Sequence, residues 1–329
     1  MRSSDPEFGS IADRYAIFSA HEAAVSSETY ASLAATVSRS DAALSFLSTL
    51  PPERQQPNLF FAALRWTGEL PCNSNDLGAA IRQRGDDIRH VMLSRTTQTN
   101  EPGRCATLLP LLAQLSQPLA LIEVGASAGL CLLFDRYGYD FGSKKIAPAA
   151  GYGPDTPFFQ CDINDTVPLP DGPIDIAWRR GLDLNPLDVT NSEDTAWLET
   201  LVWPEHTSRL ENLKAALRIA QSCPPVIEQG NLLHDLSRLA AQAPDDATLV
   251  IFHTAVLAYV ASVSDRKRFC DSVLTVADYW VSNESPHVVP GTSGVIPENQ
   301  KTERFVIALN GKPVAWASPH GQTLHWLPG

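Results

Sequence analysis

The sequence predicts an α/β protein with a doubly wound, mostly parallel sheet, an antiparallel C-terminal hairpin and a helical N-terminal domain. After residue 118, apolar runs of strand length alternate with segments of helical periodicity. A glycine-rich turn follows the first run, at Gly125 and Gly129. Asn310-Gly311, a strong hairpin signal, separates two of the last runs. Together these signals indicate parallel strands with helical crossovers and an antiparallel edge.

The composition limits the class of protein. With 329 residues the chain is long enough for one large domain with an appendage, or for two domains. Its six cysteines are scattered, with no C-x-x-C pair and no Cys/His cluster at metal spacing, which favours a reduced, cytoplasmic protein without a bound metal. No apolar run approaches the ~20 residues that span a bilayer, and the N-terminus lacks the layout of a secretion signal. We therefore expect no membrane partner.

The charge balance argues against nucleic acid as a partner. The chain has 25 Lys and Arg residues against 37 Asp and Glu residues, a formal net charge of −12. Such a surface repels a phosphate backbone. We expect a small-molecule substrate instead, and the sequence carries no signal of oligomeric state.

The first third of the chain reads as helical. Residues 1–10 have the composition of a tag or a disordered tail and are left out of the fold prediction. From residue 11 to 117, apolar residues recur at helical spacing, and breakers at Pro51-Pro52 and residues 100–103 divide them into short helices. We expect a helical N-terminal domain over 11–117, and a lid over a substrate pocket would use polar residues such as Asn58.

Residues 119–130, LALIEVGASAGL, predict a strand, a tight turn and a helix. The strand ends at Glu123, and the turn consists of Gly125, Ala126, Ser127 and Gly129. Such a turn leaves backbone N–H groups unpaired at a helix N-terminus, where the macrodipole adds positive charge and Ser127 could cap the helix. Nucleotide-type cofactors use this geometry, although a glycine turn without a cofactor has the same pattern. The E-x-G-x-S-x-G spacing disfavours NAD.

The remaining segments read as strands and connections. An irregular insertion covers 138–173, longer than the ~2–6 residues usual for a connection in such a sheet, with a strand signal at 158–163. Further strands are predicted at 174–184, 226–228, 248–252, 279–281, 304–309, 313–317 and 322–326.

This order of elements resembles that of class I S-adenosyl-L-methionine (SAM)-dependent methyltransferases over residues 119–329. Their E/D-x-G-x-G-x-G motif is similar to the turn above, with Ser127 in place of the middle glycine. From about Tyr15 onward the chain also resembles a bacterial family known as domain of unknown function 2332. The matching stretches are EVGASAGL (123–130), RRGLDLNPLDV (179–189), LVWPEHTSRL (201–210), GNLLHDL (230–236) and FHTAVLAY (252–259).

The methyltransferase resemblance implies SAM as the cofactor, bound by 118–329. It implies that an acid at the end of the second strand accepts hydrogen bonds from the ribose hydroxyls. Asp183 fits this role, Asp162 competes for it, and either could instead be a turn or cap residue. Asn231, followed by Leu232, stands where the family contacts adenine, although a plain loop Asn has the same pattern.

His253 and Thr254 end the fourth strand, where such enzymes present groups to the methyl acceptor. His253 could take a proton from the acceptor, or it could simply be satisfied by a backbone carbonyl. Alternation sends Arg179 and Arg180 to opposite faces of the sheet, and we take Arg180 as the one that reaches a carboxylate. Two further substrate-binding candidates have alternatives: His206 could line the pocket or be exposed, and Tyr259 could serve only packing.

The sequence-based hypothesis is thus a SAM-dependent methyltransferase acting on a small molecule. The alternative is a non-catalytic protein that keeps the fold to bind a ligand or a partner, which the substituted glycine favours. A nicotinamide enzyme is a third, weaker possibility.

Overall fold

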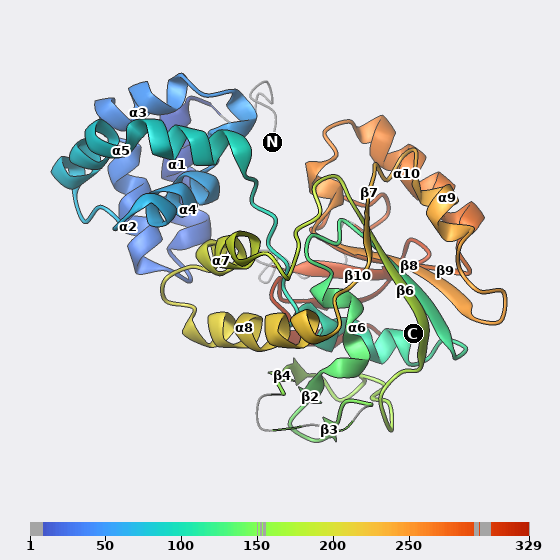
Figure 1. Ribbon diagram of the computed structural model, residues 1–329. Helices are drawn as coiled ribbons and strands as arrows, with labels where there is room; N and C mark the ends of the chain where they lie inside the picture. The colour runs from blue at the N-terminus through green and yellow to red at the C-terminus, as the bar shows by residue number, and fades with distance from the viewer. Residues whose placement is uncertain are drawn as a thin grey trace. The chain divides into compact units, whose positions relative to one another are not determined.

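The computed structural model describes residues 9–149, 151, 153, 156–292, 296 and 304–328 (Figure 1). The chain divides into two compact units. Unit 1 comprises Met1–Thr99 and Ala196–Leu210, and unit 2 comprises Asn100–Thr195 and Glu211–Gly329. The predicted boundary at residue 117 lies elsewhere, because residues 100–117 group with the sheet. A second segment, 196–210, leaves the sheet and joins the helices.

Unit 1 is helical, as the periodicity predicts. Its helices are α1 (Ile11–Ile17), the π-helix η1 (Phe18–Ala23), α2 (Glu28–Val37), α3 (Asp41–Ser48), η2 (Pro52–Arg54), α4 (Pro57–Thr67) and α5 (Ser74–Ser94). Ser10, Ser27, Ser40 and Asn73 accept first-turn N–H groups at the starts of α1, α2, α3 and α5. Of the predicted tail, residues 1–8 lie outside the described residues, while Ser10 belongs to the fold as a cap.

The core of unit 1 is aromatic and includes residues from the distant segment 196–210. Tyr30 packs on Phe61 with ring centroids 4.9 Å apart, and on Trp203 at 5.3 Å. Trp197 is buried in the same cluster. Aromatic side chains bury large areas, so these contacts explain why this segment groups with the helices.

Unit 2 is built on a nine-stranded sheet in the order β5-β12-β11-β10-β9-β8-β1-β6-β7. These strands are β1 (Leu119–Val124), β5 (Asp162–Ile163), β6 (Ile176–Asp183), β7 (Ile227–Gln229), β8 (Thr248–Thr254), β9 (Tyr279–Glu284), β10 (Phe305–Leu309), β11 (Lys312–Ala317) and β12 (Thr323–Trp326). The run from β7 to β9 is parallel, and β10 and β11 continue it antiparallel. The expected mixed α/β sheet, mostly parallel, is confirmed.

Helices cover the central strands of unit 2. They are α6 (Arg104–Leu112), η3 (Leu130–Leu132), η4 (Phe134–Arg136), α9 (Leu236–Ala240), η5 (Leu257–Tyr259) and α10 (Val263–Val276), while α7 (Ser192–Leu201) and α8 (Thr207–Ser222) each run from one unit into the other. On one face, Ile122 and Ile251 pack with Phe269 of α10, which lies beside α9 (Figure 1). On the other face, Phe134 packs edge-on against Phe252. The sheet is thus apolar on both faces, as parallel sheets are.

The C-terminal hairpin forms where it was predicted. Asn310 and Gly311 both have positive φ, 51° and 77°, as a two-residue hairpin turn of the favoured kind requires. The insertion 138–173 is less irregular than expected. Its strands β2 (Gly138–Asp140), β3 (Lys145–Ile146) and β4 (Phe158–Gln160) form a small second sheet, and β5 joins the edge of the large one.

Within residues 125–137, which the structure describes throughout, the helix expected after the glycine turn does not form. Two single turns of 3-10 helix, η3 and η4, stand in its place, and Ser127 has a φ of 52° and caps neither. Side chains take the hydrogen bonds that a helix would need: Asn100 Oδ1, 30 residues away, accepts the Leu130 N–H at 2.8 Å, and the Tyr137 hydroxyl donates to the Leu130 carbonyl at 2.9 Å. The predicted helix N-terminus, and its anion-binding dipole, therefore do not form here.

Candidate functional site

The candidate site is the carboxyl edge of the sheet around β1. From β1 the sheet continues to β6 and β7 on one side and to β8 and β9 on the other. Open α/β sheets bind ligands at this kind of reversal. The register between neighbouring strands places four polar side chains on the same face of the sheet at this edge. They are Glu123, Asp183, Thr254 and Asn283. All four belong to unit 2.

The glycine turn at this edge uses its own backbone donors. Gly125 N–H donates to the Leu182 carbonyl at 2.7 Å, and Ala126 N–H donates to the same oxygen at 3.3 Å. Ser127 N–H donates to Asp183 Oδ2 at 2.8 Å, and Gly129 N–H donates to the Ala126 carbonyl at 2.7 Å. The expectation of unpaired N–H groups here is wrong for these four residues.

The glycines of the turn are needed for packing within the chain. Gly125 has a φ of +70°, and a Cβ placed on it would overlap Cγ2 of Val256. Gly129 has a φ of +71°, and its Cβ would lie 2.7 Å from Cβ of Pro225. A side chain at either position would require both left-handed backbone and displaced neighbours. Val256 thus occupies the space beside Gly125.

Asp183 holds this turn. Its Oδ2 accepts from Ser127 N–H and its Oδ1 accepts from Asn185 N–H, both at 2.8 Å. The competing acid, Asp162, lies in β5, with β12, β11, β10, β9 and β8 between it and β1. Of the two, only Asp183 lies at the reversal, and its role toward a ribose stays a prediction.

Glu123 is a buried acid and the last residue but one of β1. Its side chain is 1% exposed, and Oε2 has no hydrogen-bond partner among the described residues. Burial raises the pKa of this carboxyl well above its usual value, and the nearby Cys131 and Asp183 raise it further, while Arg104 lowers it. This shift favours the protonated carboxyl, which can act as a hydrogen-bond donor.

His253 lies on the opposite face, in a closed network. Its Nδ1–H donates to Glu284 Oε1 at 2.7 Å, and the Trp280 indole donates to its Nε2 at 3.0 Å. The ring is 0% exposed. Both nitrogens are engaged, so His253 could take a proton from a substrate only by giving up one of these bonds. Its partner is a side-chain carboxylate rather than the backbone carbonyl considered from sequence.

Glu284 connects this network to the loop over the glycine turn. The same Oε1 also accepts the N–H groups of Val256 at 2.8 Å and Leu257 at 3.0 Å. Ala255, just before them, has a φ of 56°, which is uncommon for a residue other than glycine. Glu284 thereby holds Val256 in its place against Gly125.

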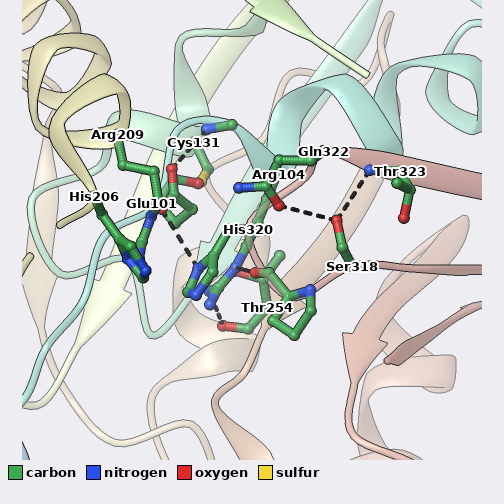
Figure 2. A network of polar contacts seen from close by, with 12 residues as sticks. Glu101, Arg104, Cys131, His206, Arg209, Thr254, Ser318, His320, Gln322 and Thr323 are labelled. Carbon is green, nitrogen blue, oxygen red and sulfur yellow. Dashed lines mark hydrogen bonds and ion pairs between the residues drawn. The ribbon is translucent and has the colours of Figure 1, made fainter. Parts of the chain in front are cut away.

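Thr254 is hydrogen-bonded to Arg104, an arginine that no sequence signal marks. Arg104 Nη1 donates to Oγ1 of Thr254 at 3.1 Å and to its carbonyl at 3.3 Å (Figure 2). Arg104 Nε donates to the Pro319 carbonyl at 2.8 Å. The first residue of α6 is thus bound to the end of β8 and to the loop before β12.

Other predicted residues of unit 2 lie apart from this group of contacts. Asn231 forms a turn, in which its Oδ1 accepts the Leu233 N–H at 2.8 Å, and Leu232 is half-buried against the core on the His253 face. Arg180 lies over the Trp178 ring at 5.1 Å. Tyr259 is 63% exposed and does not serve core packing.

The two arginines of β6 do separate as alternation predicted. Arg179 donates to both carboxylate oxygens of Asp135, at 2.6 and 2.9 Å, on the face of Phe134. Arg180 lies on the opposite face with Trp178. The arginine that pairs with a carboxylate is therefore Arg179, and its partner belongs to the chain.

Asn58 and His206 belong to unit 1 and are brought near each other there. Trp203 Nε1 donates to Asn58 Oδ1 at 3.1 Å, and the His206 ring stacks on Trp203 with centroids 5.5 Å apart. His206 Nε2–H donates to the Ser26 carbonyl at 3.0 Å. The segment LVWPEHTSRL thus builds a polar and aromatic cluster inside unit 1.

Sequence reasoning missed Arg104, Asn283 and Glu284. Arg104 lies in a stretch of helical periodicity with nothing to mark it, but the other two carried a signal. The strand predicted at 279–281 continues through Ser282, Asn283 and Glu284. Polar residues at the carboxyl end of a parallel strand are candidates for a ligand edge.

The described residues contain no helix long and apolar enough to cross a membrane. Among them, no three or more His, Cys, Asp or Glu side chains are grouped so as to hold a metal ion.

Fold and site together define an open α/β-sheet protein with a polar edge at a topological reversal. The chain belongs to the family described as "Uncharacterized protein conserved in bacteria (DUF2332)", whose model matches residues 73–326. This match confirms the second resemblance for residues 73–326, which include the whole of the described sheet, and residues 15–72 of that resemblance lie outside the match. No curated protein and no solved structure matches the chain.

Proposed function

We propose that this chain is a SAM-dependent methyltransferase acting on a small molecule. The main support is the placement of Glu123 and Asp183 on one face, at the carboxyl ends of neighbouring parallel strands, beside the reversal of the sheet. The strand order, third-second-first-fourth-fifth, is that of doubly wound folds that bind nucleotide cofactors in this position.

The side chains at this edge are suited to such a cofactor. Asp183 would hold the ribose hydroxyls, because its carboxylate is an acceptor-only group at the carboxyl end of β6. The unpartnered Oε2 of Glu123 would face the amino acid end. When bound, SAM supplies an activated methyl group. The protein mainly has to align the acceptor with it and exclude water.

The proposal is tested first by binding. The melting temperature should rise with SAM or S-adenosylhomocysteine and not with NAD or NADP, because a ligand at 100 times its Kd stabilises the native state by about 2.7 kcal/mol. Asp183→Asn keeps the size of the side chain and should abolish the shift, whereas the matched Asp162→Asn should retain it. A rise in melting temperature with NAD alone, or no rise with any of the four ligands, would contradict the proposal.

A second function has a specific observation in its favour. The turn's N–H groups are bonded within the chain and Val256 covers Gly125, so the turn is fully used as structure. This arrangement suits a protein that keeps the fold to bind a ligand or a partner without transferring a methyl group. Incubation with labelled SAM and a bacterial metabolite extract separates the two: a labelled product supports the enzyme, and SAM binding without any product supports the non-catalytic protein.

A further inference from the structure

Arg104 is a buried cation that has no carboxylate partner in the part of the chain that the structure describes. The residue is 6% exposed, and its bonds go to neutral oxygens of Thr254 and Pro319. No carboxylate of the described residues lies within ion-pair distance of its guanidinium. Burying an arginine is costly unless an anion compensates the charge, and its fork of donors suits a carboxylate or a phosphate.

The acids nearest in the fold do not supply that compensation. Glu101 Oε1 accepts the Gly103 N–H at 3.3 Å, and its Oε2 lies 3.5 Å from His320 Nδ1 (Figure 2). Burial raises the pKa of the Glu123 carboxyl well above its usual value, which favours its uncharged form, and the ion pairs of the described residues include none between Glu123 and Arg104. The N-terminal end of α6, which starts at Arg104, adds further positive potential and has no acidic residue in its first turn.

Asn283 provides a second, independent observation that points to a ligand. Its side chain is 0% exposed, and neither Nδ2 nor Oδ1 has a hydrogen-bond partner among the described residues. It pairs in register with Thr254, which Arg104 binds, and with Ile307 of β10. Arg104 also lies 5.6 Å from the ring of Phe305, two residues from Ile307 on the same strand. The unpartnered amide therefore lies on the strand positions that Arg104 covers.

A buried amide with both atoms unpaired costs about 1–3 kcal/mol for each group left unsatisfied. A ligand that accepts from Nδ2 and donates to Oδ1 removes this cost, and a carboxylate next to a hydroxyl or an amine does both. A phosphate fits less well, because phosphates usually take several backbone N–H groups and those of the neighbouring turn are bonded.

We propose that Arg104 and Asn283 form a subsite for the carboxylate of a small-molecule substrate that carries a hydroxyl or an amine beside it. The carboxylate pairs with the guanidinium and accepts from Asn283 Nδ2, while the neighbouring donor bonds to Oδ1. The subsite deepens the proposed function by naming its substrate class, but binding alone is enough to test it.

The experiment uses lactate as the probe and the full chain. Thermal unfolding is followed with sodium lactate, propionate, phosphate and chloride at equal ionic strength. At about ten times its Kd, lactate should raise the melting temperature of unit 2 by about 3–5 °C, and the effect should saturate. Propionate, which lacks the hydroxyl, should act more weakly. A rise in melting temperature with phosphate alone would show that the ligand is not a carboxylate and would overturn the proposal.

Variants locate the effect. Asn283→Leu keeps the volume and removes the unpaired amide, so the free protein should be as stable as the parent or more stable, yet the lactate shift should vanish. Arg104→Met should also lose the shift, and Arg268→Met, an exposed arginine of α10, is the matched control that should keep it. If Arg104→Met fails to fold, Asn283→Leu still decides. A lactate shift that persists in Asn283→Leu, or one absent from the parent, overturns the subsite.

The SAM shift measured in Asn283→Leu separates two sources of carboxylate. A substrate subsite leaves the SAM shift unchanged while the lactate shift is lost. Loss of both assigns the site to the amino acid end of the cofactor and overturns the substrate assignment. If SAM does not bind the parent at all, the proposed function fails, and the lactate result still stands by itself.

Discussion

His253 and Thr254 are neighbours in the sequence and end the same strand, but they meet opposite surroundings. On one face, His253 has both ring nitrogens bonded, to Glu284 and Trp280, and is fully buried. On the other, Thr254 lies between the buried Arg104, which has no carboxylate partner among the described residues, and the Asn283 amide, which has no hydrogen-bond partner among them. The comparison teaches that a residue's chemical type does not make it reactive, because its partners decide what remains available to a ligand.

The largest expected effect breaks the closed face. Glu284→Leu leaves His253 Nδ1–H and the N–H groups of Val256 and Leu257 unpaired, so the free energy of unfolding should fall by about 3–5 kcal/mol. Denaturant titration measures it. Ser282→Ala, on the same strand and face, removes a hydroxyl that has no described partner and should change stability by less than about 0.5 kcal/mol. Equal losses in both variants would contradict the network.

The next effect concerns the loop that Glu284 holds. Gly125→Ala should cost about 2–4 kcal/mol, from a left-handed backbone and from overlap with Val256. Gly142→Ala is the control, because Gly142 has a φ of +73° with nothing within 4 Å of its added Cβ, and should cost only about 1–2 kcal/mol. Adding Val256→Ala to Gly125→Ala should restore part of the difference. Equal urea midpoints for Gly125→Ala and Gly142→Ala would show that contact with Val256 adds no cost at position 125.

The open face should show a smaller, pH-dependent effect. The folded pKa of Glu123 is raised, so its native form holds a proton that the unfolded form has lost above about pH 4.5, and stability falls as pH rises beyond that value. Glu123→Gln, which cannot ionise, should match the parent at pH 4 and exceed its stability by about 1–2 kcal/mol at pH 7. Unfolding midpoints across this range measure the gap.

Asp140 should show a pH dependence of stability with the opposite sign. The Lys145 ammonium and the Gly142 N–H lower the pKa of its carboxyl, so its contribution is lost as pH falls, and Asp140→Asn should differ most from the parent at neutral pH. If the difference in stability between Glu123→Gln and the parent does not change with pH, Glu123 is ionised in the folded protein.

The smallest effect is expected at Thr254. Thr254→Val keeps the shape and removes one of the two acceptors that Arg104 Nη1 uses, and the carbonyl remains. Stability should fall by about 1 kcal/mol. Thr254→Ser, which keeps the hydroxyl, should recover most of it in the same denaturant titration. No recovery would indicate that the lost methyl packing, and not the hydrogen bond, is responsible.

The strands and the hairpin were predictable because their signals are local. A run of apolar residues such as 248–252 needs only its own pattern to favour a strand, and Asn310-Gly311 is suited to its turn whatever lies around it. The site was predictable only in outline. The sequence marked the edge at Glu123, Asp183 and Thr254, but not the contacts that define it.

By itself, then, the sequence determined the α/β class, the strand positions and the edge at which polar residues gather, because these follow from short-range periodicity and turn chemistry. Only the tertiary structure decided the rest. Single helical turns form after Gly129 in place of a helix, because Asn100 and Tyr137 bond to Leu130. The His253 ring has no free Nδ1–H, because Glu284, 31 residues away, accepts it. The tertiary structure also grouped segment 196–210 with unit 1. Each outcome depends on partners far apart in the chain, whose hydrogen bonds and packing outweigh the local preference.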